Sequence, residues 1–383
     1  MRFLLIIVLL LIINIFESCG DRMESHKITN ITDKGSLIKK AERFTIEQKE
    51  GYTRVTIINP WQGAENISQE YILVKRKTEL PDGIDSLKVI RIPLESIICM
   101  STTYIAMISA LGEEKTISGV SGKDFIYLDN IIKKVEMGLI RDVGYEANLN
   151  KELILKIFPD LVMMYGIGSE SAGYVAKIKE LGVKVLFNAD YLETDPLKKA
   201  EWIKLFGALY CKESMADSIY KSEVDSYNML QSYINKNITE RPKVLLGLPF
   251  KDTWYISPGN SFISKLIRDA GGEYLWQNTQ SDLAMPLGIE NVYLRAIKAD
   301  FWLNIGSINS ANEISNVDKR LMELPCFKHG DLFNNNKRVT VNGGNDYWES
   351  GSVFPHLILK DIASILHPGI FNDHELFFYS KIY

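Results

Sequence analysis

The feature that most constrains the fold is a segment near the middle of the chain, residues 212–235, that contains neither glycine nor proline. Apolar side chains recur in it every three or four residues, as on the buried face of a helix: Met215, Ile219, Tyr220, Val224, Tyr227, Leu230 and Ile234. At 1.5 Å per residue, this predicts one helix of about 36 Å, as long as a small domain is wide. Because Arg241 and Pro242 follow, we expect this linking helix at residues 212–238.

Short apolar strands alternate with helices on both sides of this segment. On the N-terminal side we expect strands at residues 97–100, 117–120, 161–165 and 184–187, and helices at 102–111, 150–157 and 174–181. On the C-terminal side we expect strands at 243–250, 301–306 and 338–341, and helices at 261–270 and 356–366. Such alternation indicates parallel sheets covered on both faces. The predicted fold class is α/β, with two Rossmann-like lobes of mainly parallel sheet, residues 43–211 and 239–383, joined by one long α-helix.

A β-rich extension precedes the first of these alternations. The runs at residues 52–61 and 70–77 are rich in β-branched and aromatic side chains and are separated by Gly63, which predicts an antiparallel pair. Residues 87–93 predict a third short strand. We assign this extension to the N-terminal lobe.

The first residues have the pattern of a secretory signal. Arg2 is followed by an apolar run at residues 3–13, which is shorter than the roughly 20 residues needed to span a bilayer. Cys19 follows a small residue near the end of this segment, and the arrangement resembles the bacterial lipobox, in which the cysteine is lipidated. We therefore predict a signal peptide at residues 1–18 and a polar tether at 19–42, with ordinary secretion as the alternative.

Charge and the metal-ligating residue types exclude two classes of function. The net charge is −4 and no basic block occurs, which argues against a nucleic-acid partner. Besides Cys19, the chain has Cys99, Cys211 and Cys326, which are far apart, and none of its five histidines pairs with another at helical metal-ligand spacing. We expect no protein metal site and no intrinsic cofactor.

Motifs of common enzymes are incomplete in this chain. The glycine-rich run at residues 166–173 would need glycine at position 171 for a dinucleotide-binding GxGxxG, but Ser171 stands there. Neither a phosphate-binding GxxxxGK[ST] nor a GxSxG nucleophile motif occurs. We predict no catalytic residues and a protein that binds its ligand without converting it.

Several runs together resemble the helical-backbone (class III) solute-binding proteins that serve ABC importers for cobalamin, iron chelates and haem. These runs, in the order of that family, are residues 93–112, 143–166, 177–187, 261–272 and 297–306. Residues 246–259, 342–351 and 359–368 resemble a lipoprotein branch of the same family. The resemblance implies the two-lobed fold with a helical connection.

In that family the ligand lies between the lobes, held by loops at the carboxyl ends of strands. Carried over residue by residue, the resemblance implies these ligand-binding residues: Ser101, Thr102, Thr103, Tyr104, Tyr145, Tyr165, Trp254, Tyr255, Asp346, Tyr347, Trp348 and Glu349. Residues 343–351 would form one wall of the cleft, where Tyr347 and Trp348 stack on a flat macrocycle or chelate. For the two carboxylates of that loop we expect hydrogen-bond acceptance or helix capping, not catalysis.

Members of the family dock on their permease through one carboxylate on each lobe. The resemblance implies this role for Glu170 on the first lobe, whereas Asn260 stands at the expected glutamate position on the second. The implied partner is the permease of an ABC importer. The expected protein is a monomer that touches the membrane only through its lipid.

The signal and the resemblance together predict a lipid-anchored binding protein that faces the periplasm in the envelope of a Gram-negative bacterium. It would capture a metal chelate, such as a ferric siderophore, cobalamin or haem, in the interlobe cleft and deliver it to the importer. Two alternatives stay open: an envelope lipoprotein that scavenges its ligand without a permease, and a metal chelatase-like enzyme on the same fold.

Overall fold

The computed structural model describes residues 37–145, 148–166 and 182–383 of the chain. The predicted signal peptide, Cys19, most of the tether, Glu170 and the helix expected at 174–181 lie outside these ranges. All of the described residues belong to one compact unit. Within the described ranges, no helix combines the length and the apolar character that crossing a membrane requires.

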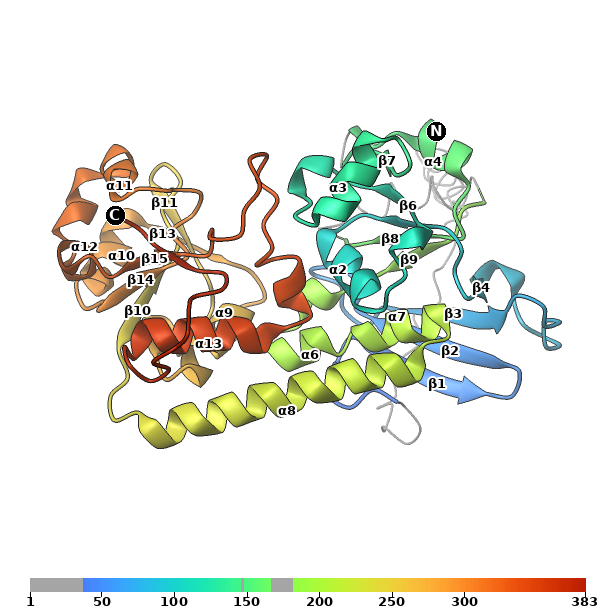
Figure 1. The fold of residues 1–383 in the computed structure, drawn as a ribbon, viewed down its shortest axis with the longest axis horizontal. Coiled ribbons are helices and arrows are strands. Elements are labelled where there is room, and N and C mark those ends of the chain that lie inside the picture. Colours follow the sequence, from blue (N-terminus) through green and yellow to red (C-terminus); the bar gives the residue numbers. More distant parts are fainter. Residues whose placement is uncertain (1–36, 146–147, 167–181) are drawn as a thin grey trace, which may run out of the picture. The chain divides into compact units, whose positions relative to one another are not determined.

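The N-terminal lobe is built on a parallel sheet of strand order β7-β6-β5-β8-β9 (Figure 1). Its strands are β5 (Ile97–Cys99), β6 (Ile117–Val120), β7 (Arg141–Asp142), β8 (Leu161–Met164) and β9 (Val185–Phe187). The helices are α2 (Thr102–Ala110), α3 (Asp129–Glu136), α4 (Lys151–Ile157), α6 (Pro196–Ala200) and α7 (Ile203–Tyr210). Ile97 and Cys99 pack in one apolar cluster and Ile98 in another. This alternation buries both faces of the sheet.

The N-terminal extension forms a second sheet on the same lobe. Its strands run in the order β1 (Phe44–Lys49), β2 (Tyr52–Ile58), β3 (Ser68–Lys75) and β4 (Val89–Ile92). The predicted antiparallel pairing of β2 with β3 is confirmed, and the third predicted strand, β4, adds parallel to β3. β1 was not predicted, and it pairs antiparallel with β2. Phe44 and Val55 belong to the same apolar cluster as the main sheet, so the extension is part of the lobe core.

The last part of the predicted tether is packed against the fold. Ile38 is buried, and the backbone N–H groups of Lys39, Lys40 and Ala41 donate to the carboxylate of Glu201 at 2.9, 2.7 and 2.8 Å. Glu201 is itself fully buried. The side chains of this segment did not predict the contact with Glu201, because the bonds are donated by backbone N–H groups.

The expected linking helix is α8 (Glu213–Asn237), a helix of 25 residues. It runs along α6 and α7 of the first lobe and along α13 (Pro355–Leu366) of the second (Figure 1). Tyr220 packs in the N-terminal core, whereas Tyr227 and Ile234 pack in the C-terminal core. One helix therefore contributes to both cores.

The C-terminal lobe contains the second mainly parallel sheet, of strand order β12-β10-β14-β15-β16. Its strands are β10 (Lys243–Leu246), β12 (Glu273–Tyr274), β14 (Phe301–Leu303), β15 (Leu332–Asn334) and the antiparallel edge strand β16 (Ser380–Lys381). Strands β11 (Thr253–Ile256) and β13 (Met285–Gly288) form a separate two-stranded antiparallel sheet. The remaining helices are α9 (Phe262–Asp269), α10 (Ile289–Ala296), α11 (Ala311–Val317) and α12 (Pro325–His329).

Short 3-10 turns complete the described elements: η1 (Ser86–Lys88), η2 (Glu114–Thr116), η3 (Lys123–Phe125), η5 (Asp190–Leu192), η6 (Lys319–Glu323) and η7 (Ser350–Ser352). The predicted strand at residues 338–341 is wrong, because only one isolated bridge, between Val339 and Asn345, forms there. The predicted fold class is confirmed: two α/β lobes with mainly parallel sheets, connected by a long helix.

Candidate functional site

The first group of predicted site residues follows β5 in the N-terminal lobe. Ser101 is the N-cap of α2, and its Oγ accepts a hydrogen bond from the backbone N–H of Thr103 at 3.4 Å. Thr102 and Thr103 are half-buried. Tyr104 is almost fully buried, and its hydroxyl donates to the carbonyl of Asn188 at 3.4 Å. This corrects the expectation for Tyr104, whose side chain belongs to the core and offers no surface to a ligand.

A buried carboxylate that the sequence analysis missed lies beside these residues. Asp190 follows β9, is 2% exposed, and its Oδ2 has no hydrogen-bond partner in the described part of the chain. Burial raises the pKa of Asp190, and Lys199, whose Nζ lies 3.9 Å from Oδ2, opposes the rise. The neighbouring Tyr191 meets the half-buried ring of Tyr165 edge to face, with centroids 6.3 Å apart. The carboxyl edge of this sheet therefore carries a polar and aromatic cluster.

Tyr145 lies at the carboxyl end of β7 and is half-exposed. Its ring meets that of Phe125 edge to face, with centroids 5.9 Å apart and an interplanar angle of 78°. Phe125 is also exposed and was not among the predicted residues. The two rings form an aromatic surface available to a ligand.

The loop of residues 343–351 is largely buried, contrary to its expected role as a cleft wall. Asp346 is buried and pairs with Arg338, its Oδ2 lying 2.6 Å from Nε. Tyr347 is buried against the rings of Phe378 and Tyr379, and burial raises its pKa to about 12. Only Trp348, which is 52% exposed, presents its ring to solvent. The expected stacking of Tyr347 on a ligand is therefore corrected, because its ring is enclosed by other aromatics.

Glu349 joins this loop to the N-terminal lobe. Its side chain is fully buried, and its carboxylate accepts hydrogen bonds from the backbone N–H groups of Tyr127 at 2.8 Å and Leu128 at 3.1 Å. Burial raises the pKa of Glu349 to about 7, although the two N–H donors oppose the rise. The carboxylate thus serves a contact between lobes and has no surface for a ligand.

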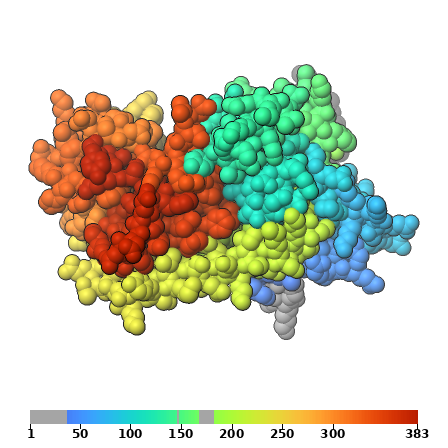
Figure 2. Space-filling model, viewed as in Figure 1, coloured from blue at the N-terminus to red at the C-terminus, as the bar shows by residue number. Residues whose placement is uncertain are grey.

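A close backbone approach supports the same joint. A Cβ atom at Gly344 would lie 2.0 Å from the carbonyl oxygen of Ile126, so only glycine fits there. The guanidinium carbon of Arg338 lies 5.0 Å from the centre of the Tyr127 ring. In the space-filling view the segment around residue 344 (orange-red) meets the N-terminal lobe (green) (Figure 2). The loop is therefore an interlobe contact that leaves Trp348 open.

Of the adjacent residues Trp254 and Tyr255, the first lies in the core and the second at the surface. Trp254 is fully buried, donates from Nε1 to the carbonyl of Leu246 at 3.0 Å, and packs beside Trp302. Tyr255, the next residue on β11, is 57% exposed. Successive strand residues point to opposite faces. This corrects the expectation for Trp254 and leaves Tyr255 as the residue that a ligand can reach.

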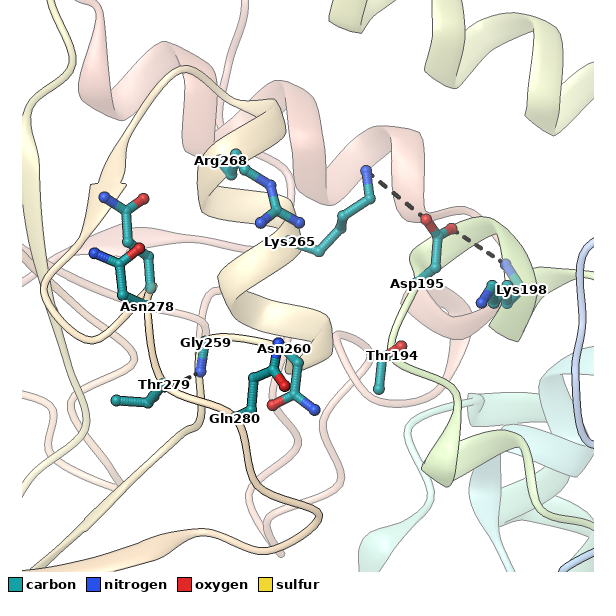
Figure 3. Close-up of a pocket in the computed structure, with 11 residues that line it drawn as sticks. Thr194, Asp195, Lys198, Gly259, Asn260, Lys265, Arg268, Asn278, Thr279 and Gln280 are labelled. Atoms are coloured by element: carbon teal, nitrogen blue, oxygen red, sulfur yellow. Dashed lines mark hydrogen bonds and ion pairs between the residues drawn. The ribbon is translucent and has the colours of Figure 1, made fainter.

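One pocket is lined by residues of both lobes, and sequence analysis did not find it as a ligand site. It has a volume of about 460 Å³. Thr194 and Asp195 precede α6 and Lys198 lies within it, whereas α9 and the loops around it supply the opposite wall (Figure 3). Asn260, placed at the docking position by resemblance, lies in this wall. Three segments that are separated in the sequence form the pocket, so no local sequence pattern predicts it.

Fixed polar contacts shape this pocket. Asp195 caps α6, because its Oδ1 accepts from the N–H of Leu197 at 2.8 Å. Its Oδ2 lies 3.7 Å from Nζ of Lys265, which also pairs with Asp269 on α9. The Oδ1 of Asn260 accepts from the N–H of Ser281 at 3.2 Å. The ion pair between Asp195 and Lys265 connects the two walls.

Metal ligands do not gather in the part of the chain that the structure describes, where no group of three or more histidine, cysteine or acidic residues could hold an ion. Cys99, Cys211 and Cys326 are free thiols. Burial raises the pKa of Cys326 to about 12, so this thiol stays protonated near neutral pH.

Residues 97–342, more than half of the chain, match the family model described as periplasmic binding protein. The chain therefore belongs to the periplasmic binding protein family. Its architecture and structural neighbours assign it to the class with a helical connection, as predicted. An uncharacterized lipoprotein of Methanocaldococcus jannaschii is 29% identical over 347 residues, covering 85% of this chain and 81% of that relative. That organism is an archaeon, so the expected Gram-negative origin has no support from this relative.

Solved structures with the same fold include two proteins named for their ligands. A periplasmic haem-binding protein from Pseudomonas aeruginosa has a TM-score of 0.57 at 15% identity, covering 72% of this chain and 94% of that one. An ABC-type Fe³⁺-hydroxamate transport protein from Saccharomonospora viridis has a TM-score of 0.53 at 16% identity, again covering 72% and 94%. At these identities the similarity shows the fold.

Proposed function

We propose that this protein is a lipid-anchored receptor that captures a metal chelate between its lobes and delivers it to an ABC importer. The observation that carries the proposal is the pocket lined by Thr194 and Lys198 on one lobe and by Asn260 and Arg268 on the other. A site made by two lobes holds a ligand by contacts from both sides, which suits capture and later release.

The relatives support the class of ligand and the anchor. The family comprises solute-binding proteins, and two neighbours of the same fold are named for haem and for Fe³⁺-hydroxamate. The relative from Methanocaldococcus jannaschii is named a lipoprotein, which agrees with lipidation at Cys19. The proposed location is the outer face of the cell membrane, with the anchor as the only membrane contact.

Exposed aromatic side chains outside this pocket are further proposed ligand contacts that remain from the predicted set. They are Tyr145, Tyr255 and Trp348, together with Phe125, which the sequence analysis missed. Ser101, Thr102 and Thr103 add polar groups at the edge of the N-terminal sheet, and Tyr165 adds a half-buried ring. Permease docking through Glu170 is retained as part of the proposal.

A second candidate function is favoured by one residue. Asn260 stands where the family resemblance implies a docking carboxylate, and its side chain is engaged with Ser281 inside the pocket. A receptor without this carboxylate could scavenge a ligand with no permease. Crosslinking in native membranes followed by purification separates the two candidates, because only the importer receptor carries a permease with it.

The binding function is tested by titration calorimetry of the full-length protein with haemin, cyanocobalamin, ferric citrate and a ferric hydroxamate. We expect saturable binding of at least one of them at a ratio of one to one. Native mass spectrometry of the freshly purified protein should show the mass of a bound chelate. Absence of binding across the panel, with no bound small molecule in the native protein, contradicts the proposal.

A further inference from the structure

The chemistry of the pocket between α6 and α9 indicates what it can hold. None of the eleven residues that line it has an aromatic or a purely aliphatic side chain. Four carry carboxamides, two are threonines, three are cationic and one is acidic. A flat apolar macrocycle needs apolar walls, whereas this lining offers hydrogen bonds in every direction.

The three cations of the pocket differ in how they are engaged. Lys198 pairs with Glu42, and Lys265 pairs with Asp195 and Asp269. Arg268 is exposed, and its guanidinium has no ion pair within the described residues. It lies one helical turn from Lys265, on the same face of α9 (Figure 3). Arg268 is therefore the cation that is free to pair with an incoming anion.

Carboxamides supply neutral donors and acceptors to the same pocket. Gln277, Asn278 and Gln280 line the loop beside α9, and Asn260 keeps its Nδ2 donors while its Oδ1 is engaged. Carboxamides pair equally well with hydroxyl groups and with carboxylate oxygens. A guanidinium binds a carboxylate through two parallel hydrogen bonds.

We propose that this pocket binds a hydrophilic ligand that presents a free carboxylate to Arg268 and hydroxyl or carbonyl oxygens to the surrounding amides. The inference rests on the proposed function and narrows it. The chelate belongs to the anionic, hydroxycarboxylate type, and the ligand is not a haem or a corrin. Thr194 and Lys198 reach the same ligand from the other lobe, so its binding favours the arrangement in which Asp195 and Lys265 are paired.

The test is titration calorimetry of the full-length protein with ferric citrate, citrate alone, haemin, cyanocobalamin and a ferric hydroxamate that has no free carboxylate. Arg268→Gln removes the guanidinium but keeps a polar side chain at an exposed position. Lys298→Gln, which removes one positive charge from an exposed position of the same lobe outside the pocket, is the matched control. Thermal unfolding of each variant checks that the fold is intact.

We expect ferric citrate to bind and Arg268→Gln to raise its dissociation constant by roughly tenfold or more, as loss of a charged hydrogen-bond pair predicts. The control should change it by less than about twofold. Binding of haemin, cyanocobalamin or the hydroxamate without any binding of citrate overturns the inference while the proposed function stands. If metal-free citrate binds but ferric citrate does not, and this binding is lost in Arg268→Gln, the inference about the pocket is supported and the proposed function is contradicted.

One further outcome separates a ligand pocket from a docking surface. If Arg268→Gln leaves ferric citrate binding unchanged but abolishes co-purification with a permease, the carboxylate belongs to a partner protein and the inference is wrong.

Discussion

At the scale of single residues, buried carboxylates carry much of the architecture. Glu201 holds the entering chain, Glu349 connects the lobes and Glu193 binds the N–H groups of Glu42 and Arg43. Each accepts hydrogen bonds from backbone N–H groups far away in sequence, and such bonds leave no trace in side-chain patterns. Burial raises the pKa of Glu193 and of Glu349 to about 7.

These pKa values predict how stability depends on pH. A carboxyl whose folded pKa is raised binds its proton more tightly in the folded state, so the free energy of unfolding falls as the pH rises. The fall should begin near the ordinary pKa of about 4.5 and be complete above about pH 7. Urea unfolding between pH 4.5 and 8 should show this slope, and in Glu349→Gln the decrease should be smaller by on the order of 3 kcal/mol.

Glu375→Gln is the control for that measurement. Glu375 is exposed, and its pairing with Lys337 lowers its pKa, so its replacement should not flatten the slope. A parallel pH dependence in wild type and Glu349→Gln would show that Glu349 does not titrate in this range.

Trp348 differs from its neighbours because half of its surface is open. If it is an anchor for the chelate, Trp348→Ala should weaken binding by about 2 kcal/mol, as truncation of an interface aromatic does. The free energy of unfolding should fall less in Trp348→Ala than in Tyr347→Ala, since Tyr347 is enclosed by Phe378 and Tyr379. Calorimetry and urea unfolding measure the two effects, and an unchanged dissociation constant removes Trp348 from the site.

At the scale of elements, the loop of residues 343–351 shows how tertiary contacts overrule a local interpretation. Its glycines and aromatics suggested a flexible, ligand-facing wall. In the structure Gly344 approaches Ile126, and Asp346 and Glu349 are buried in polar contacts. Glycine can make a loop flexible, but at position 344 its missing side chain allows two backbone segments to come into contact.

This contact predicts the result of adding one methyl group. Gly344→Ala places Cβ against the carbonyl oxygen of Ile126, so the free energy of unfolding should fall by about 1–3 kcal/mol, as in other overpacked sites. Gly288→Ala is the matched control, because the nearest atom to its Cβ, on the side chain of Glu290, is 4.0 Å away. Equal stability of the two variants in urea unfolding would contradict the close approach at Gly344.

At the scale of the whole molecule, α8 contributes apolar side chains to the cores of both lobes and makes polar contacts with helices of the C-terminal lobe. The carboxylate of Glu223 accepts from the N–H of His356 at 2.8 Å and contacts its Nδ1 at 2.6 Å. The hydroxyl of Tyr227 donates to Asp269 at 2.8 Å. Together with the Glu349 joint, these contacts restrict independent motion of the lobes, so ligand capture by large domain rotation is not expected.

Breaking α8 between the two cores tests this coupling. Asp225 is exposed, and Asp225→Pro removes one helical hydrogen bond and introduces a clash, which costs about 3 kcal/mol in a helix interior. We expect two separate unfolding transitions in calorimetric scans of this variant. Asp225→Ala should keep one transition and lose less than about 1 kcal/mol. A single transition of wild-type stability in Asp225→Pro would show that α8 does not couple the lobes.

The site was less predictable than the fold, and particular residues show the reason. Tyr255 and Trp348, which were expected to bind ligand, are exposed, but Trp254 and Tyr347 beside them are buried. The alternation of β11 could have separated Trp254 from Tyr255, since one of two successive strand residues must face the core. No local rule could have identified the pocket around Arg268, because its walls come from segments more than sixty residues apart.

Local sequence determined the elements whose signal is periodic and self-contained: the long helix α8, the alternating strands and helices, and the class of fold that they imply. These depend on hydrophobic spacing, which is a property of neighbouring residues. Only the tertiary structure decided which aromatics are buried, which carboxylates join distant segments and where polar walls face each other. Those outcomes depend on contacts between residues far apart in the chain, and the strength of a buried polar group is set by the partner that folding brings to it.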